Sequence, residues 1–111
     1  MAQQTSIRNV SIVAGDAAVG LDIGVFPDYQ HLNAGAPYTL GGGGAVEDVA
    51  VYGGAVSMRA AATQFAYRSV LLSGGQTAGL ELTTAFTTWA VAFVGLRVEN
   101  TPVGVRLAGA L

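Results

Sequence analysis

The stretch that decides the fold is "AVGLDIGVF", which runs from Ala18 to Phe26. Its apolar side chains occupy alternate positions, and they are Val19, Leu21, Ile23 and Val25. Glycine and aspartate fill the positions between them, at Gly20, Asp22 and Gly24. A period of two is typical of a β-strand with one buried face. Pro27 ends the run, so the stretch predicts one short, half-buried strand.

The same alternation appears along the rest of the chain. Three further runs follow it: "GLELTTAF" (79–86), "TTWAVAFV" (87–94) and "PVGVRLAGAL" (102–111). Two more strands are predicted at "IRNVSIVA" (7–14) and "AVEDVAVY" (45–52). The apolar parity shifts after Phe93, towards Leu96 and Val98, so we expect a bulge or bend at Gly95. The 14 valines and nine threonines favour strands throughout.

One segment, "VSMRAAATQFAYRSVLLSGG" (56–75), fits two structures. As a helix it places Met58, Ala62, Phe65 and Leu72 near one face and ends at Gly74. As a strand it places Phe65, Tyr67 and Leu71 on one side. We expect a short helix or loop near Arg59–Thr63, followed by a strand from about Gln64 to Leu72.

Glycine-rich turn signals separate the runs at short intervals. They are "AGDA", "FPDYQ", "NAGAP", "GGGG", "YGG", "SGGQ" and "ENTP". Many short strands with such punctuation predict an all-β protein. We expect a single domain over residues 1–111, an antiparallel sandwich, jelly roll or small barrel with short Gly-rich turns. Residues 1–6 form a polar N-terminal arm, and no internal repeat is apparent.

Four consecutive glycines, Gly41–Gly44, raise the question of a phosphate site. A P-loop needs a lysine after its glycines, and the chain has no lysine. A dinucleotide-binding fingerprint has the pattern G-x-G-x-x-G, and if it started at Gly42 its third glycine would fall on Glu47. The glycines instead favour a loop between strands, which either orders on contact with a neighbour or is a plain flexible connection.

Composition excludes several classes of function. Only 11% of the 111 residues are charged, the net charge is -2, and the five basic residues are scattered arginines. A nucleic-acid binder needs a clustered basic face, so no nucleic-acid partner is expected. The apolar run Leu82–Leu96 is too short for a membrane helix, and the N-terminus lacks the apolar core of a signal peptide. A surface so poor in charge favours self-association.

No constellation of residues indicates chemistry. His31 is the only histidine, and a triad with Asp28 and a serine can be drawn, but no G-x-S-x-G elbow marks a nucleophile. Glu47 and Asp48 are neighbours, so on a strand they point to opposite faces. The chain has no cysteine and no calcium-loop motif. We therefore predict a protein that is not an enzyme and has no catalytic residue, cofactor or metal.

In its size, scarcity of charge, polar start "MAQQTS" and strand-like run to Leu111, the chain resembles the decoration (cement or staple) proteins of tailed-bacteriophage capsids. It is most similar to the staple proteins of epsilon-type short-tailed phages. The resemblance implies a structural protein of the virion that binds the outer capsid surface. Its partners would be the major capsid protein and further copies of itself, as a dimer or trimer. It would clamp neighbouring capsid subunits and so stabilise the shell.

Polar arms, turn aromatics and terminal strands are typical contact elements of such an assembly protein. The predicted interface residues are Gln3, Gln4, Tyr29, His31, Tyr38, Tyr52 and Leu111. Two alternatives stay open. One is a carbohydrate-binding β-sandwich module with the turn tyrosines and His31 as its platform. The other is a different virion component, such as a tail-tube or head-completion protein.

Overall fold

The computed structural model describes residues 4–23, 43–60, 65–83 and 92–108. They form eight strands: β1 (Gln4–Gly15), β2 (Val19–Ile23), β3 (Gly43–Gly53), β4 (Val56–Ala60), β5 (Phe65–Ser73), β6 (Ala78–Thr83), β7 (Ala92–Glu99) and β8 (Val105–Ala108). The described ranges contain no helix, so the all-β prediction is confirmed for them. None of them could cross a membrane as a helix.

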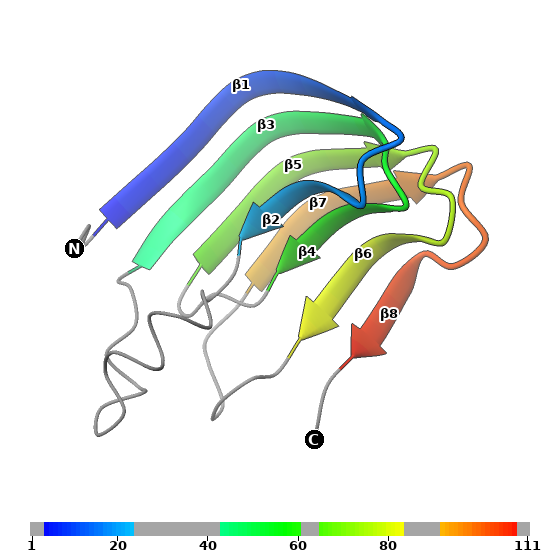
Figure 1. Ribbon diagram of the computed structural model, residues 1–111. Helices are drawn as coiled ribbons and strands as arrows, with labels where there is room; N and C mark the ends of the chain where they lie inside the picture. Colours follow the sequence, from blue (N-terminus) through cyan, green and yellow to red (C-terminus); the bar gives the residue numbers. More distant parts are fainter. Residues whose placement is uncertain (1–3, 24–42, 61–64, 84–91, 109–111) are drawn as a thin grey trace, which may run out of the picture.

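The strands form two four-stranded sheets, and every strand pairing in them is parallel. One sheet has the order β1-β3-β5-β7 and the other the order β2-β4-β6-β8 (Figure 1). The prediction of an antiparallel sandwich or jelly roll is therefore wrong. The signals "AGDA", "YGG", "SGGQ" and "ENTP" do mark turns, but each of these turns carries the chain from a strand of the first sheet into the second sheet. The signals "FPDYQ" and "NAGAP" lie outside the described residues. None of the four described turns closes a hairpin.

The chain winds in four coils, where a coil is an odd-numbered strand, its turn and the even-numbered strand that follows. Each strand pairs with the strand at the same position in the neighbouring coil. Val49, for example, pairs with Val10 on one side and with Val70 on the other. Parallel neighbours need a long crossover, and here the strand of the other sheet supplies it. This arrangement is a parallel β-solenoid. The expectation of no internal repeat is corrected, because the fold itself repeats.

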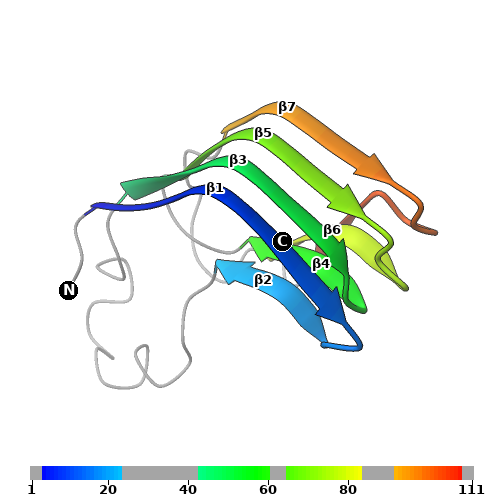
Figure 2. The same ribbon diagram turned by 90° about the horizontal axis from the view of Figure 1, so that it is seen from above.

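The long strands bend midway, and all four of them bend alike (Figures 1 and 2). In its middle part each contains a residue with a positive φ, and these residues are Asn9 (54°), Asp48 (52°), Ser69 (52°) and Gly95 (72°). The pairing registers place them at equivalent positions of successive coils. Asn, Asp and Gly tolerate the left-handed region better than other residues. The bend predicted at Gly95 is confirmed, and it is one of a row of four.

A second row of left-handed residues begins the turns between the sheets, at Gly15, Gly53, Gly74 and Asn100. Backbone hydrogen bonds join each turn to the next. The amide of Gly54 donates to the carbonyl of Gly15 at 3.0 Å, and that of Gly74 donates to Glu99 at 3.1 Å. The turns therefore stack in register with the strands, which aligns the second sheet on the first.

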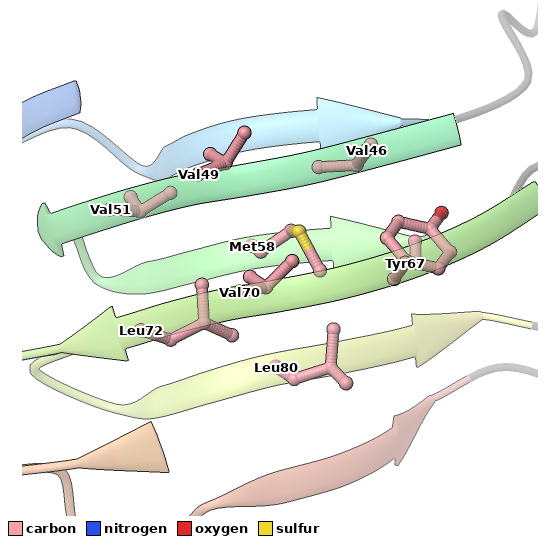
Figure 3. Packing of buried hydrophobic residues seen from close by; sticks show 9 residues of the cluster. Val46, Val49, Val51, Met58, Tyr67, Val70, Leu72 and Leu80 are labelled. Atoms are coloured by element: carbon pink, nitrogen blue, oxygen red, sulfur yellow. The ribbon is translucent and has the colours of Figure 1, made fainter. Parts of the chain in front are cut away.

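The core lies between the two sheets and consists of rows of apolar side chains from successive coils (Figure 3). Its fully buried members include Val46, Val51, Met58, Leu72 and Leu80. Tyr67 lies in the same cluster, and its ring stacks on Phe93 with 4.5 Å between ring centroids. Each row continues from coil to coil, so burial of one side chain depends on the coils above and below it.

The two sheets approach closely where the even-numbered strands begin. A Cβ at Gly20 would lie 2.6 Å from Val51 Cγ1, and one at Gly79 would lie 2.3 Å from Val98 Cγ1. Ser57 occupies the equivalent position of the second coil. It is fully buried, and its hydroxyl donates to the carbonyl of Gly53 at 2.8 Å. Small residues at this row let the short strands pack against the long sheet.

The individual strand predictions can be compared with these bounds. The strands predicted at 7–14 and 45–52 are confirmed within β1 and β3, and the described part of 64–72 lies within β5. Strands β2, β6, β7 and β8 overlap the other predicted runs, but residues 102–104 belong to the turn before β8. Arg59 belongs to strand β4, not to a helix or loop, and residues 61–64 lie outside the described ranges. Gly43 and Gly44 belong to β3, while Gly41 and Gly42 lie outside the described ranges.

Candidate functional site

The interface residues expected from the sequence are placed only in part. Tyr52 lies near the end of β3, and its side chain is exposed. Gln4 begins β1, where it pairs with Gly43, so it lies at the opposite end of the strand pair from Tyr52. Strand β1 therefore includes residues 4–6 of the expected arm. Gln3, Tyr29, His31, Tyr38 and Leu111 lie outside the described residues.

The strongest concentration of polar side chains in the described ranges lies on the short sheet. Asp22, Arg59, Glu81 and Arg106 occupy one register position of β2, β4, β6 and β8. We call these four residues the charge ladder. Adjacent strands lie about 4.8 Å apart. The ladder therefore crosses the sheet along the solenoid axis, with a charge on every coil and with alternating sign.

Two ion pairs hold the charge ladder together. Arg59 donates from Nε to Asp22 Oδ1 at 3.3 Å and from Nη2 to Oδ2. Arg106 donates from Nε to Glu81 Oε2 at 3.0 Å and from Nη2 to the same oxygen. Arg59 and Asp22 are about two-fifths exposed, and Glu81 is the most buried member, with 13% of its side chain exposed. The guanidinium groups are thus held in fixed planes at the surface.

Arg59 feels the acids of both neighbouring strands. The hydrogen bond to Asp22 raises its pKa above the ordinary value, partial burial opposes the rise, and the charges of Asp22 and Glu81 add to it. Exposed ion pairs of this kind contribute at most about 1 kcal/mol each to stability. Stability alone is therefore a weak reason for four charges in a chain with so few, and alignment of the strands or binding of a ligand is a stronger one.

The long sheet carries charges in a looser arrangement. Arg8 Nη2 lies 3.5 Å from Glu47 Oε1 across β1 and β3, with 62% of the arginine side chain exposed. Arg97 Nε lies 3.0 Å from Glu99 Oε2 within β7. The row that begins with Arg8 and Glu47 ends at Val94, so its alternation breaks off at the last coil. In the described ranges, no group of three or more His, Asp or Glu could hold a metal ion.

Sequence reasoning did not find the charge ladder, although the chain contains a signal for it. The signal is a four-residue pattern: a small residue, then an apolar residue, then a charged residue, then an apolar or small residue. It occurs in "GLDI", "SMRA", "GLEL" and "GVRL", which begin at Gly20, Ser57, Gly79 and Gly104. The intervals between them are unequal, because the segments that separate successive strands differ in their number of residues. A search for a fixed period therefore misses the motif.

Comparisons with known proteins do not place the chain in a family. No protein-family model, curated protein or solved structure matches it. Any function must therefore be argued from the geometry of its own residues.

Proposed function

We propose that this protein binds a neutral polymer that is rich in hydroxyl groups, a polysaccharide, along the charge ladder. The observation that carries the proposal is the in-register row of four polar side chains whose charges cancel. A polymer laid along the solenoid axis meets one fixed polar group per coil, at intervals of about 4.8 Å. Such a row suits a ligand that repeats along its length.

The ion pairs leave hydrogen-bonding capacity free within the described part of the chain. A guanidinium carries five N–H donors, and Arg59 directs Nε and Nη2 at Asp22. Arg106 uses the same two nitrogens on one oxygen of Glu81, so Glu81 Oε1 accepts no described bond. The remaining N–H groups and oxygens can bond hydroxyl groups. Their side chains are already fixed by the pairing, which lowers the entropy cost of binding.

The sign of the charges decides which class of polymer fits. Two acids alternate with two arginines, so a polyanion attracted by the arginines would also meet Asp22 and Glu81 at close range. A polycation meets the converse conflict with Arg59 and Arg106. Hydroxyl groups both donate and accept, and they satisfy either sign without a net charge. The proposal retains the carbohydrate alternative predicted from the sequence but moves its surface from the turn tyrosines to the short sheet.

The clamp on a viral capsid surface stays a prediction from the resemblance. So do the virion location, the non-enzymatic character and the partnership with a major capsid protein. The antiparallel sandwich or jelly roll predicted from the strand pattern is overturned by the parallel sheets.

The test is affinity electrophoresis and titration calorimetry of the full chain with soluble neutral glucans and xylans and with a polyuronate. We expect saturable binding to a neutral polymer that changes little with salt. Arg59→Gln should weaken it at least about tenfold, because a hydrogen bond from a charged donor contributes about 1.5–3 kcal/mol.

Arg8→Gln is the matched control, because it removes the same charge from a cross-strand pair on the other sheet. It should leave the affinity unchanged. Equal losses in Arg59→Gln and Arg8→Gln would show that the ladder is not the binding surface. Binding to the polyuronate alone, weakened by salt, would contradict the neutral-ligand argument.

A further inference from the structure

The two ends of the solenoid present free sheet edges. At one end β1 and β2 pair on one side only, and at the other end the same holds for β7 and β8, within the described residues. All pairings are parallel, so β7 and β8 of one copy can pair with β1 and β2 of another copy in the same way as neighbouring coils pair within one copy. An unpaired parallel edge is a template for another strand.

We propose that a second copy of this chain stacks head-to-tail on the first, with β7 and β8 of one copy against β1 and β2 of the next. The existing register fixes which residues would meet. The position of Val105 corresponds to Leu80, Met58 and Leu21, so Val105 would lie beside Leu21 of the second copy. By the same register, Arg106 meets Asp22 and Leu107 meets Ile23. This inference is independent of polysaccharide binding.

Charge complementarity favours this partner and this direction. The charge ladder begins with Asp22 and ends with Arg106, so a head-to-tail junction continues its alternation without a break. On the long sheet the junction brings the uncharged Val94 beside Arg8, and no like charges meet there. Two last coils facing each other would instead oppose Arg106 to Arg106. A junction between unlike ends is therefore favoured over a symmetric one.

Apolar exposure at the ends supports the same junction. Val105 is 50% exposed, whereas its equivalents Leu80 and Met58 in the central coils are buried. Leu107 is 61% exposed, whereas its equivalents Leu82 and Ala60 are half-buried and buried. Val10 at the other end is 39% exposed, and its equivalents Val49 and Val70 are buried. Repeat proteins usually close such ends with polar capping coils. Stacking would extend each core row into the next copy.

A head-to-tail junction that continues the strand register moves each copy along the solenoid axis, so it forms an open stack and not a closed ring. Each added copy leaves one free end of each kind, so the assembly is an open rod that grows with concentration. This behaviour distinguishes it from the closed dimer or trimer expected from the sequence.

The test is light scattering of the full chain over a wide range of concentration. We expect the mean mass to grow in multiples of the 11.2 kDa chain. Leu107→Lys blocks the last coil and Val10→Lys blocks the first, so each variant alone should stay a monomer. An equimolar mixture should reach twice the monomer mass and stop, because the two unmodified ends meet and the two lysine ends remain.

Gln76→Lys is the matched control, since it adds the same charge at an exposed turn position of a central coil and should leave growth unchanged. Circular dichroism and thermal melting check that each variant folds, and Val105→Lys replaces Leu107→Lys if that variant does not. A wild-type monomer at every concentration would overturn the proposal. So would dimers of either lysine variant alone, because these require like ends to meet.

Discussion

At the scale of single residues, Tyr67 shows how the stack controls chemistry. Its side chain belongs to the core row that Val46 and Phe93 continue on either side. The ring stacks on Phe93, and burial raises the pKa of the hydroxyl above its ordinary value. Tyr52, on the central strand β3, is exposed on the outer face. Burial between the coils is therefore what raises the pKa of Tyr67.

The raised pKa of Tyr67 predicts a loss of stability at alkaline pH. The unfolded chain releases this proton near pH 10 while the folded chain keeps it, so the free energy of unfolding falls as pH rises beyond 10. Between pH 9 and 11 the wild type should lose about 1.4 kcal/mol more than Tyr67→Phe. Urea unfolding at the two pH values measures the difference. Equal losses in both proteins would show that Tyr67 titrates normally in the folded state.

At the scale of strands, the sequence could predict what a strand buries but not what it pairs with. Alternation in "AVGLDI" and the parity shift around Gly95 reflect the inner face of each strand, and both predictions are confirmed. The same alternation is far commoner in antiparallel sheets, which often have one solvent-exposed face, than in parallel sheets. Short glycine-rich turns between strands also favour an antiparallel arrangement. Here they are the corners between two parallel sheets.

The charge ladder escaped prediction for a related reason. Asp22, Arg59 and Arg106 each read as an ordinary solvated residue on the outer face of a strand. Only the register brings them into one row, and the unequal numbers of residues between the strands hide that register in the sequence. Of the interface residues expected from the sequence, the structure describes Gln4 and Tyr52, and it places them at opposite ends of the strands.

The row of bends predicts an effect of substitution at Ser69. Its φ of 52° is unfavourable for a β-branched side chain, so Ser69→Val should lower the free energy of unfolding by about 1–3 kcal/mol. Ser69→Asn places there the residue type that the first coil has at Asn9, and it should not destabilise. Ser11→Val, on an exposed strand position without a positive φ, should stay within about 0.5 kcal/mol. Chemical denaturation measures the free energy of unfolding of the three variants. If Ser69→Val and Ser11→Val destabilise equally, the positive φ at Ser69 does not explain the effect.

At the scale of the whole molecule, stability should vary along the stack. Each coil contacts only the coils beside it, so a solenoid approximates a one-dimensional chain of units and interfaces. The central strands contain Val46, Val70 and Leu80, which are buried, while Leu107 on β8 is largely exposed. An outer coil has one interface to lose and an inner coil has two. Opening should therefore begin at the ends.

Hydrogen exchange measured by mass spectrometry tests this gradient. In the Leu107→Lys variant, which cannot stack, amides of β3 to β6 should exchange at least about tenfold more slowly than those of β1 and β8. The factor corresponds to about 1.4 kcal/mol of opening free energy. Rates are compared after correction for the intrinsic exchange of each peptide. Equal protection in all four coils would mean that they open as one cooperative unit. In the wild type at high concentration, stacking should slow β1 and β8 while leaving β3 to β6 unchanged, because only the end coils gain an interface.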